Sequence, residues 1–230
     1  MSATSFLSLV NGQMSADIYP ARDRSTAVRR AVTISRQAGC GAREVAEKLA
    51  ARMQVHQPHD ASPWTVFDRD LMDKVLEQHQ LPKYLARFLP EDRIPVLESM
   101  MNDIFNLYPA QQTIVKQTAE TLLGLAELGS AILIGRAGNI VTAQMKHVLH
   151  VRLVAPLDQR IRHAREDYGM EPIQARNFCL REDLGRERYV RKYFNADIND
   201  PLLYHMVINT GLVGYDVAAR LIEDALLQHD

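Results

Sequence analysis

The sequence predicts an α/β fold in which short parallel strands alternate with helices. Short apolar segments such as Ala131–Ile134 (AILI) end abruptly in glycine turns, amphipathic helical segments follow them, and this alternation recurs along the chain. Short apolar runs bounded by turns are typical of buried parallel strands. Strands that alternate with helices favour parallel pairing through right-handed crossovers.

Composition sets the limits of the prediction. The chain has 230 residues, 47% of them hydrophobic and 24% charged, enough for one large α/β domain or a core domain with an insertion. Its net charge of −1 argues against a general nucleic-acid binder. The apolar run AILIG is five residues long, far shorter than the roughly 20 residues that span a bilayer, so no membrane partner is expected. Cys40 and Cys179 have no metal-ligand spacing, and a reduced cytoplasmic setting is expected.

The first structural unit is a strand, a glycine turn and a helix. Residues 1–27 are expected to be a poorly ordered lead-in to a single domain over 28–230. Ala31–Ser35 (AVTIS) is predicted to be a strand, Gly39 and Gly41 form the turn, and a helix begins at Arg43. Its apolar residues recur four apart, and Glu44 lies four residues before Lys48.

This unit is a candidate anion site. A strand that enters a helix through such a turn directs unpaired N–H groups and the positive end of the helix dipole at one point, most often at phosphate. The phosphate-loop pattern G-x-x-x-x-G-K-[ST] is not met, because Arg36 stands at its first glycine and Ala42 at its lysine. Without further support, a tight connection is an equally good interpretation of this turn.

The middle of the chain predicts one strand and a helical lobe. Thr65–Phe67 is predicted to be a strand that ends at Asp68. Residues 69–129 are almost wholly helical in pattern and far longer than a crossover needs, which indicates an inserted lobe. His56, His59 and His79 fit no ligand spacing, so these histidines are expected to be solvated and no metal site is predicted.

Three more strands follow the lobe. Ala131–Ile134 ends in a second glycine turn, GRAGN (135–139), and His147–Val154 leads to Pro156 in the first turn of a helix. His205–Asn209 is predicted to be the last strand and Val213–Leu227 the last helix. Ligands of parallel sheets bind at the carboxyl ends of the strands, and both glycine turns lie there.

The segment from Arg160 to Lys192 is strongly charged. It holds nine positive residues, eight of them arginine, against six acidic ones. One interpretation is a solvated helix with i,i+4 ion pairs such as Asp158 with Arg162. The other is a phosphate-binding surface, because the planar guanidinium suits bidentate phosphate contacts better than an ammonium does.

Taken together, these segments resemble the cytidylate-kinase-like family of phosphate-loop proteins. The resemblance is carried in order by ISRQAGCGAREVAEKLA, FDRDL, IGRAGNIV, VRLVAPLDQRI, LREDLGRERYVRKYF and YHMVINT. It implies a nucleoside-monophosphate-kinase fold: a three-layer phosphate-loop NTPase core with a five-stranded parallel sheet, a monophosphate-binding helical insertion (69–129) and an arginine-rich lid region (160–195).

The resemblance also implies roles for individual residues. Gly39 through Arg43 would hold the β- and γ-phosphates of ATP, within a cofactor-binding set made of Ser35, Arg36, Gly39, Cys40, Gly41, Ala42, Arg43 and Glu44. Asp68 and Arg69 would face the acceptor nucleotide and Arg136 its phosphate. The lid residues Arg181 and Arg186, with Arg188 or Arg191, would close over the transferred group, and Asp183 would orient them. ATP and Mg²⁺ are the implied cofactors, and Arg43, Arg136, Arg181, Asp183 and Arg186 the implied catalytic residues.

Departures from the family pattern leave the activity open. Cytidylate kinases have a lysine where this chain has Ala42, a small hydroxyl residue at Glu44, and an acid where it has Ala137. Arg43 or Arg36 could replace the lysine, and Ser35, Asp68 or a water could serve magnesium. The first hypothesis is phosphoryl transfer to a nucleoside monophosphate, with CMP or dCMP as first acceptors. The alternatives are a nucleotide-binding regulatory module without kinase activity and a kinase for a non-nucleotide acceptor; a homodimer is compatible with the apolar helices.

Overall fold

The computed structural model describes residues 29–56, 63–68, 94–107 and 113–229. Five strands form one sheet: β1 (Ala31–Arg36), β2 (Thr65–Phe67), β3 (Ala131–Ile134), β4 (Val148–Val154) and β5 (Met206–Asn209). The strand order is β2-β3-β1-β4-β5 and every pairing is parallel. The predicted α/β fold with a five-stranded parallel sheet is therefore confirmed.

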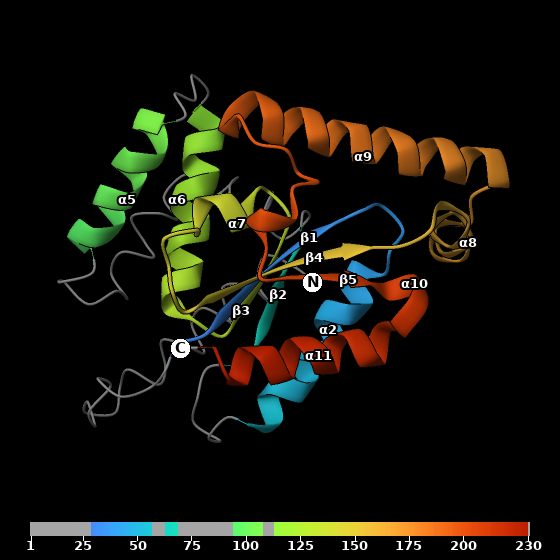
Figure 1. Cartoon of the computed structure of the whole chain (residues 1–230), viewed down its shortest axis with the longest axis horizontal. Coiled ribbons are helices and arrows are strands. Elements are labelled where there is room, and N and C mark those ends of the chain that lie inside the picture. The colour runs from blue at the N-terminus through green and yellow to red at the C-terminus, as the bar shows by residue number, and fades with distance from the viewer. Residues whose placement is uncertain (1–28, 57–62, 69–93, 108–112, 230) are drawn as a thin grey trace, which may run out of the picture.

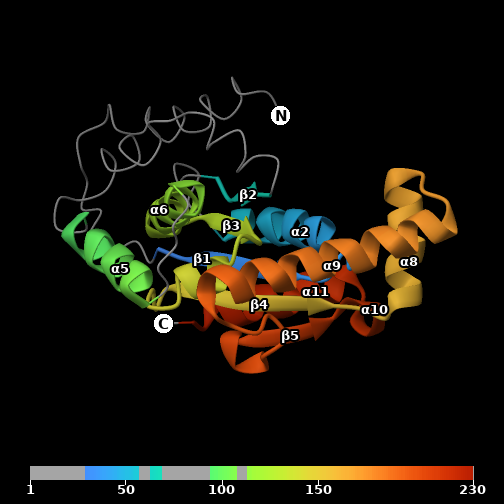
Figure 2. The ribbon, with the colours of Figure 1, turned by 90° about the horizontal axis from the view of Figure 1, so that it is seen from above.

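Helices cover both faces of the sheet, giving three layers (Figures 1 and 2). Strand residues alternate between the layers, so that Val32 and Ile34 pack toward α2 and α11 while Ala31 packs toward α6. The described helices are α2 (Ala42–Val55), α5 (Ile94–Leu107), α6 (Thr113–Leu128), α7 (Gly138–Val141), α8 (Leu157–Tyr168), α9 (Pro172–Phe194), α10 (Thr210–Val213) and α11 (Tyr215–Leu227), with a short 3-10 helix at Pro201–Leu203. Among these, none is long and apolar enough to cross a membrane.

The predicted elements match the described ones closely, with three differences. Pro156 is the N-cap of α8 and not part of its first turn. The predicted last helix is divided at Gly214, whose φ of +73° separates α10 from α11. The lead-in (1–27), His59, and the first part of the helical lobe with Arg69 and His79 lie outside the described residues.

The polar contacts in the structure differ more from those predicted from sequence spacing, because partners distant in the sequence compete for the same side chains. Lys48 does not pair with Glu44; its Nζ lies 2.7 Å from an Asp216 carboxylate oxygen on α11. His56 is exposed, as expected of a solvated histidine, but its Nε2 also lies 2.8 Å from Glu223 Oε1. The predicted Asp158–Arg162 pair is present at 3.8 Å.

Three histidine rings contact one another: His150 on β4, His205 just before β5 and His229 after α11. The ring of His150 is stacked on that of His205 with centroids 4.9 Å apart, and His229 contacts His205 edge-on at the same distance. Thr33 Oγ1 lies 2.8 Å from His150 Nδ1, and His205 Nδ1 accepts the backbone N–H of His150 at 2.8 Å. Burial and the neighbouring histidines lower the pKa of His150 to about 3. At neutral pH the buried His150 ring at the centre of the contact is therefore neutral.

We expect acid to destabilise the protein through this stack. Below pH 6.5 the unfolded chain takes up a proton that folded His150 excludes, so the free energy of unfolding falls as the pH falls. At pH 5 the expected loss is about 2 kcal/mol. Urea unfolding at pH 7.5 and pH 5.0 measures it, and His150→Gln should show a smaller difference between the two pH values. An equal difference in both proteins would contradict this assignment.

Candidate functional site

The turn between β1 and α2 (residues 37–41) is fastened to the ends of neighbouring strands. The N–H of Gln37 donates to the carbonyl oxygen of Leu153 at 3.0 Å, and the buried Cys40 thiol donates to the same oxygen at 3.6 Å. The Thr210 hydroxyl donates to the Cys40 carbonyl oxygen at 2.8 Å. Burial raises the pKa of Cys40 to about 12, so this thiol stays neutral and inward, and only the backbone of Cys40 is available to a ligand.

Both glycines of the turn are required by its shape. Gly39 and Gly41 have φ of +76° and +74°, in the left-handed region that favours glycine. A Cβ at Gly39 would lie 2.5 Å from the carbonyl oxygen of Arg160, and one at Gly41 would overlap the ring of Tyr215. The turn is thus packed tightly from behind by α8 and α11.

Consecutive backbone amides of this turn remain available. Within the described part of the chain, the N–H groups of residues 39–42 donate to no protein acceptor, and they lie at the positive end of the 14-residue helix α2. The N–H of Ala38 is already used, since it donates to Asp183 Oδ1 at 2.7 Å. The turn can therefore bind an anion with the amides of residues 39–42, but not with the amide of Ala38.

A cavity of about 640 Å³, here called the turn cavity, opens in front of this turn. It is lined by residues 36–44 together with Glu47, Asp68, Ile134, His163, Asp167, Tyr168, Phe178, Glu182 and Arg186. The walls thus combine the turn with residues of α8, α9 and the end of β2. Arg43 points to its outer part and pairs with Glu47 at 2.9 Å and Asp68 at 3.5 Å.

A second cavity of about 290 Å³, here called the arginine cavity, lies at the end of β3. Four arginines line it, and its lining includes Ser35, Arg36, Gly135, Arg136, Ala137, Asn139, Arg181, Glu182, Arg186 and Tyr189. The two cavities share Arg36, Ile134, Glu182 and Arg186. They meet at the carboxyl ends of β1 and β3, the position expected of a ligand site in a parallel sheet.

Helix α9 lies lengthwise over one face of the sheet and reaches past the strand ends toward α8 (Figures 1 and 2), and Asp183 joins it to the turn. Besides the Ala38 amide, this carboxylate binds Arg160 at 2.6 Å and Arg186 at 3.2 Å. The Arg160 side chain is only 7% exposed. Asp183 thus connects the turn, α8 and α9 in one hydrogen-bonded unit.

The structure brings many predicted site residues together and leaves two apart. Gly39–Glu44 and Asp68 line the turn cavity, Ser35, Arg136 and Arg181 line the arginine cavity, and Arg36 and Arg186 line both. Arg188 and Arg191 are exposed and line neither cavity, because they lie on the outer side of α9. The Ser35 hydroxyl accepts a hydrogen bond from Arg152 at 2.9 Å.

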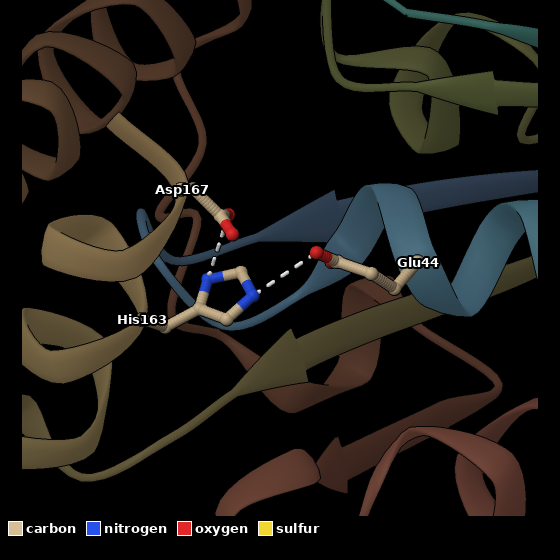
Figure 3. Close-up of side chains that lie close together, drawn as sticks. All are labelled: Glu44, His163 and Asp167. Atoms are coloured by element: carbon tan, nitrogen blue, oxygen red, sulfur yellow. Dashed lines mark hydrogen bonds and ion pairs between the residues drawn. The ribbon is translucent and has the colours of Figure 1, made fainter. Parts of the chain in front are cut away.

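A histidine lies between two carboxylates at the rim of the turn cavity (Figure 3). His163 Nε2 is 3.1 Å from Glu44 Oε1, and its Nδ1 is 3.2 Å from Asp167 Oδ2. One ligand atom from each of Glu44, His163 and Asp167 lies within 4.8 Å of the other two, which makes this cluster a candidate metal site. However, the carboxylates lie at different ring nitrogens, and one ion can bind only one nitrogen of the ring. The arrangement fits an imidazolium that joins α2 to α8.

We expect this contact to weaken at alkaline pH. The hydrogen bond that His163 donates to the Glu44 carboxylate raises the pKa of His163, and the same bond lowers the pKa of Glu44. The stabilisation is thus complete below the ordinary histidine pKa and is lost as the pH rises through the raised value, while Glu44 keeps its charge down to its lowered pKa. His163→Gln should cost about 1 kcal/mol at pH 6 and less at pH 8 in urea unfolding. The same loss at both pH values would contradict a charged contact.

Three residues of the site were not predicted from the sequence. Arg160, His163 and Tyr215 support the turn from α8 and α11, more than a hundred residues away along the chain. Arg160 and His163 stand four and seven residues after Pro156, on the first turns of a helix predicted to follow a strand. Their position near the start of this helix was the only indication in the sequence that they lie near the strand ends, but it does not show which side of the helix faces the turn.

Comparison with known families and curated proteins gives one match over most of the chain and one over part of it. A profile described as "Cytidylate kinase-like family" matches residues 31–212. A uronate isomerase of Corynebacterium glutamicum is 26% identical over 113 residues, 49% of this chain. The match covers 22% of that relative, so this chain spans about a fifth of its length.

Two solved structures are similar to this chain to different degrees. An uncharacterized protein of Eubacterium ventriosum superimposes with a TM-score of 0.66 at 20% identity, over 87% of this chain and 99% of that one. Shikimate kinase of Bacteroides thetaiotaomicron gives a TM-score of 0.46 at 12% identity, over 86% of this chain and 98% of that one.

Proposed function

This chain belongs to the cytidylate kinase-like family, and from that premise we propose that it transfers a phosphoryl group from ATP to a nucleoside monophosphate. The observation that carries the proposal is the junction of the two cavities. One contains unpaired turn amides, the other is lined by four arginines, and Arg36 and Arg186 line both. CMP and dCMP are the first acceptors to test, because the family gives that indication and the described residues specify no base.

The proposed division of labour follows the charges. The amides of residues 39–42 would bind the phosphates of ATP in the turn cavity, and Arg136 with Arg181 would bind the acceptor phosphate in the arginine cavity. Arg186, held by Asp183 and Glu182, would neutralise charge between them. Phosphoryl transfer needs little covalent chemistry from a protein, so positioning and positive charge around the transferred group supply most of the catalysis.

The turn cavity also suits a magnesium ion bound with ATP. Its walls include the carboxylates of Glu44, Glu47, Asp68, Asp167 and Glu182, and carboxylate oxygens with retained waters are what Mg²⁺ prefers. Glu44 and Asp167 contact His163 at 3.1 and 3.2 Å, whereas Asp68, at the end of β2, pairs more loosely with Arg43 at 3.5 Å, so we propose Asp68 as the carboxylate that would hold the ion. Bound there, Mg²⁺ would neutralise phosphate charge.

A second function of a different class is nucleotide binding without transfer. Two observations favour it: Ala42 and Ala137 stand where kinases of the family have a lysine and an acid, and the amide of Ala38 already binds Asp183. Loss of a lysine that bridges phosphates typically costs several kcal/mol of transition-state stabilisation. A kinase for a non-nucleotide acceptor, the third hypothesis, keeps the turn cavity and changes only the second substrate.

A coupled ADP-release assay with Mg²⁺·ATP separates these functions. The acceptors are CMP, dCMP, UMP, AMP, GMP and a panel of sugar phosphates. Turnover with a nucleotide supports the proposal, turnover with a sugar phosphate alone supports the third hypothesis, and ATP binding in calorimetry without turnover supports the second. Arg136→Met, purified identically, should lose activity at least about 100-fold and so excludes a contaminating kinase.

A further inference from the structure

Arg36 is the residue of the site whose charge is least accounted for. We propose that Arg36 contacts the transferred phosphoryl group where the turn cavity and the arginine cavity meet, and supplies there the positive charge that position 42 lacks. This inference rests on the proposed function and assigns one of its residues.

The position of Arg36 places its guanidinium at the junction. Arg36 ends β1 and lines both cavities. Its head group lies directly against Gly135 of the second glycine turn, so closely that a Cβ at position 135 would collide with Nη1. Gly135 has a φ of +84°, so the backbone there leaves the space that the guanidinium fills. Position 42, by contrast, is an alanine at the start of α2.

Partners and burial together single out Arg36 among the arginines of the site, since Arg181 is exposed. Arg43 pairs with Glu47 and Asp68, Arg160 pairs with Asp183, and Arg186 pairs with Asp183 and Glu182. Within the described ranges, no hydrogen bond or ion pair joins Arg36 to an acceptor, although the Glu182 carboxylate lies near enough to act on its charge. Positive charges on Arg186 and Arg136 lie near it instead. Three guanidinium groups thus converge here against the Glu182 carboxylate, which already pairs with Arg186 at 3.6 Å. Such an excess of positive charge forms a site for an anion.

The protonation state of Arg36 is suited to this role. Burial, with the nearby charges of Arg186 and Arg136, lowers its pKa to about 10, so it remains charged at neutral pH. A largely buried charge without a partner destabilises the folded protein unless a ligand compensates it. A bound phosphoryl group, with up to two negative charges, provides that compensation.

The step itself requires no proton from Arg36. An oxygen of the acceptor phosphate forms a bond to the γ-phosphorus of ATP, the bond from that phosphorus to the β,γ-bridging oxygen breaks, and ADP leaves with the bonding electron pair. Arg36 donates hydrogen bonds to equatorial oxygens of the phosphoryl group throughout and returns unchanged. Because these oxygens belong to the γ-phosphate of ATP and are absent from ADP, Arg36 should distinguish the two nucleotides.

The test compares Arg36→Met and Arg36→Lys with a matched control, Arg162→Met, whose side chain is 63% exposed on α8. Calorimetry with ATP and with ADP, each with Mg²⁺, measures affinity, and thermal unfolding measures stability. We expect Arg36→Met to weaken ATP binding about tenfold, a difference of about 1.4 kcal/mol, and to leave ADP binding unchanged. The melting temperature should not fall, because an unpaired charge is removed. Arg36→Lys should recover part of the ATP affinity, and Arg162→Met should match the wild type.

Two results would overturn the assignment. One is unchanged ATP and ADP affinity in Arg36→Met; the other is an equal loss for both nucleotides with a lower melting temperature, which indicates a structural role. Gly135→Ala, which displaces the guanidinium without removing it, should also weaken ATP relative to ADP. If the wild type binds ATP more tightly than ADP through Arg36 but turns over no acceptor, the proposed transfer fails while the phosphate contact stands.

Discussion

Asp183→Ala is expected to destabilise the protein by about 3–5 kcal/mol, one of the two largest effects predicted here. The carboxylate accepts hydrogen bonds from Arg160, Arg186 and the amide of Ala38, all within 3.2 Å. Its removal leaves the Arg160 guanidinium buried beside the turn without an acidic partner, and the desolvation of that charge is then uncompensated. Urea unfolding at pH 7 measures the loss.

The control for Asp183→Ala is Asp158→Ala. It removes a carboxylate of α8 that forms an exposed ion pair with Arg162 at 3.8 Å. That change should cost less than about 1 kcal/mol. The double variant Asp183→Ala/Arg160→Met should recover part of the stability, because the buried charge is removed together with its partner. A cost for Asp183→Ala no greater than that of Asp158→Ala would contradict the central position given to this carboxylate.

Gly39→Ala is expected to cost about 3 kcal/mol or more and to abolish ATP binding. Two terms add: alanine is strained at a φ of +76°, and its Cβ would lie 2.5 Å from the backbone carbonyl oxygen of Arg160. The atoms that this Cβ would meet belong to the backbone of Arg160, so no flexible side chain can turn away to make room. Relief requires a shift of the turn or of α8, and either shift moves the amides of residues 39–42. Thermal unfolding and calorimetry with ATP measure the two effects.

Gly169→Ala separates the strain from the collision. Gly169 ends α8 with a φ of +63°, but a Cβ there would meet no atom within 4 Å. It should cost about 1 kcal/mol and leave ATP binding intact. Equal costs at the two glycines would show that close packing by Arg160 contributes nothing to the turn.

Much of the fold could be predicted because its signals are local. Ala131–Ile134 is apolar and ends in a glycine, and the structure places β3 at those residues. The same holds for Thr65–Phe67 and β2. The ends of an element were predicted less accurately where they depend on one backbone dihedral, as the division of the last helix at Gly214 shows.

The candidate site could be predicted only in part. The turn at Gly39 and Gly41 and the arginines of the lid region were visible as residue types, but the sequence could not say which arginines face the cavity. Along α9, Arg181 and Arg186 line the arginine cavity whereas Arg188 and Arg191 line neither cavity, although all four belong to one charged run. The direction of a side chain on a helix depends on how the whole helix packs.

The sequence by itself determined the order of strands and helices, the glycine turn before α2 and the family, because these follow from the pattern of apolar residues and glycines along the chain. Only the tertiary structure decided which charges meet. Asp183 reaches the amide of Ala38 across 145 residues, and His163 reaches Glu44 across 119. Such contacts depend on the placement of α8 and α9 over the sheet edge, and charged side chains select partners by distance in space, which their positions in the sequence do not encode.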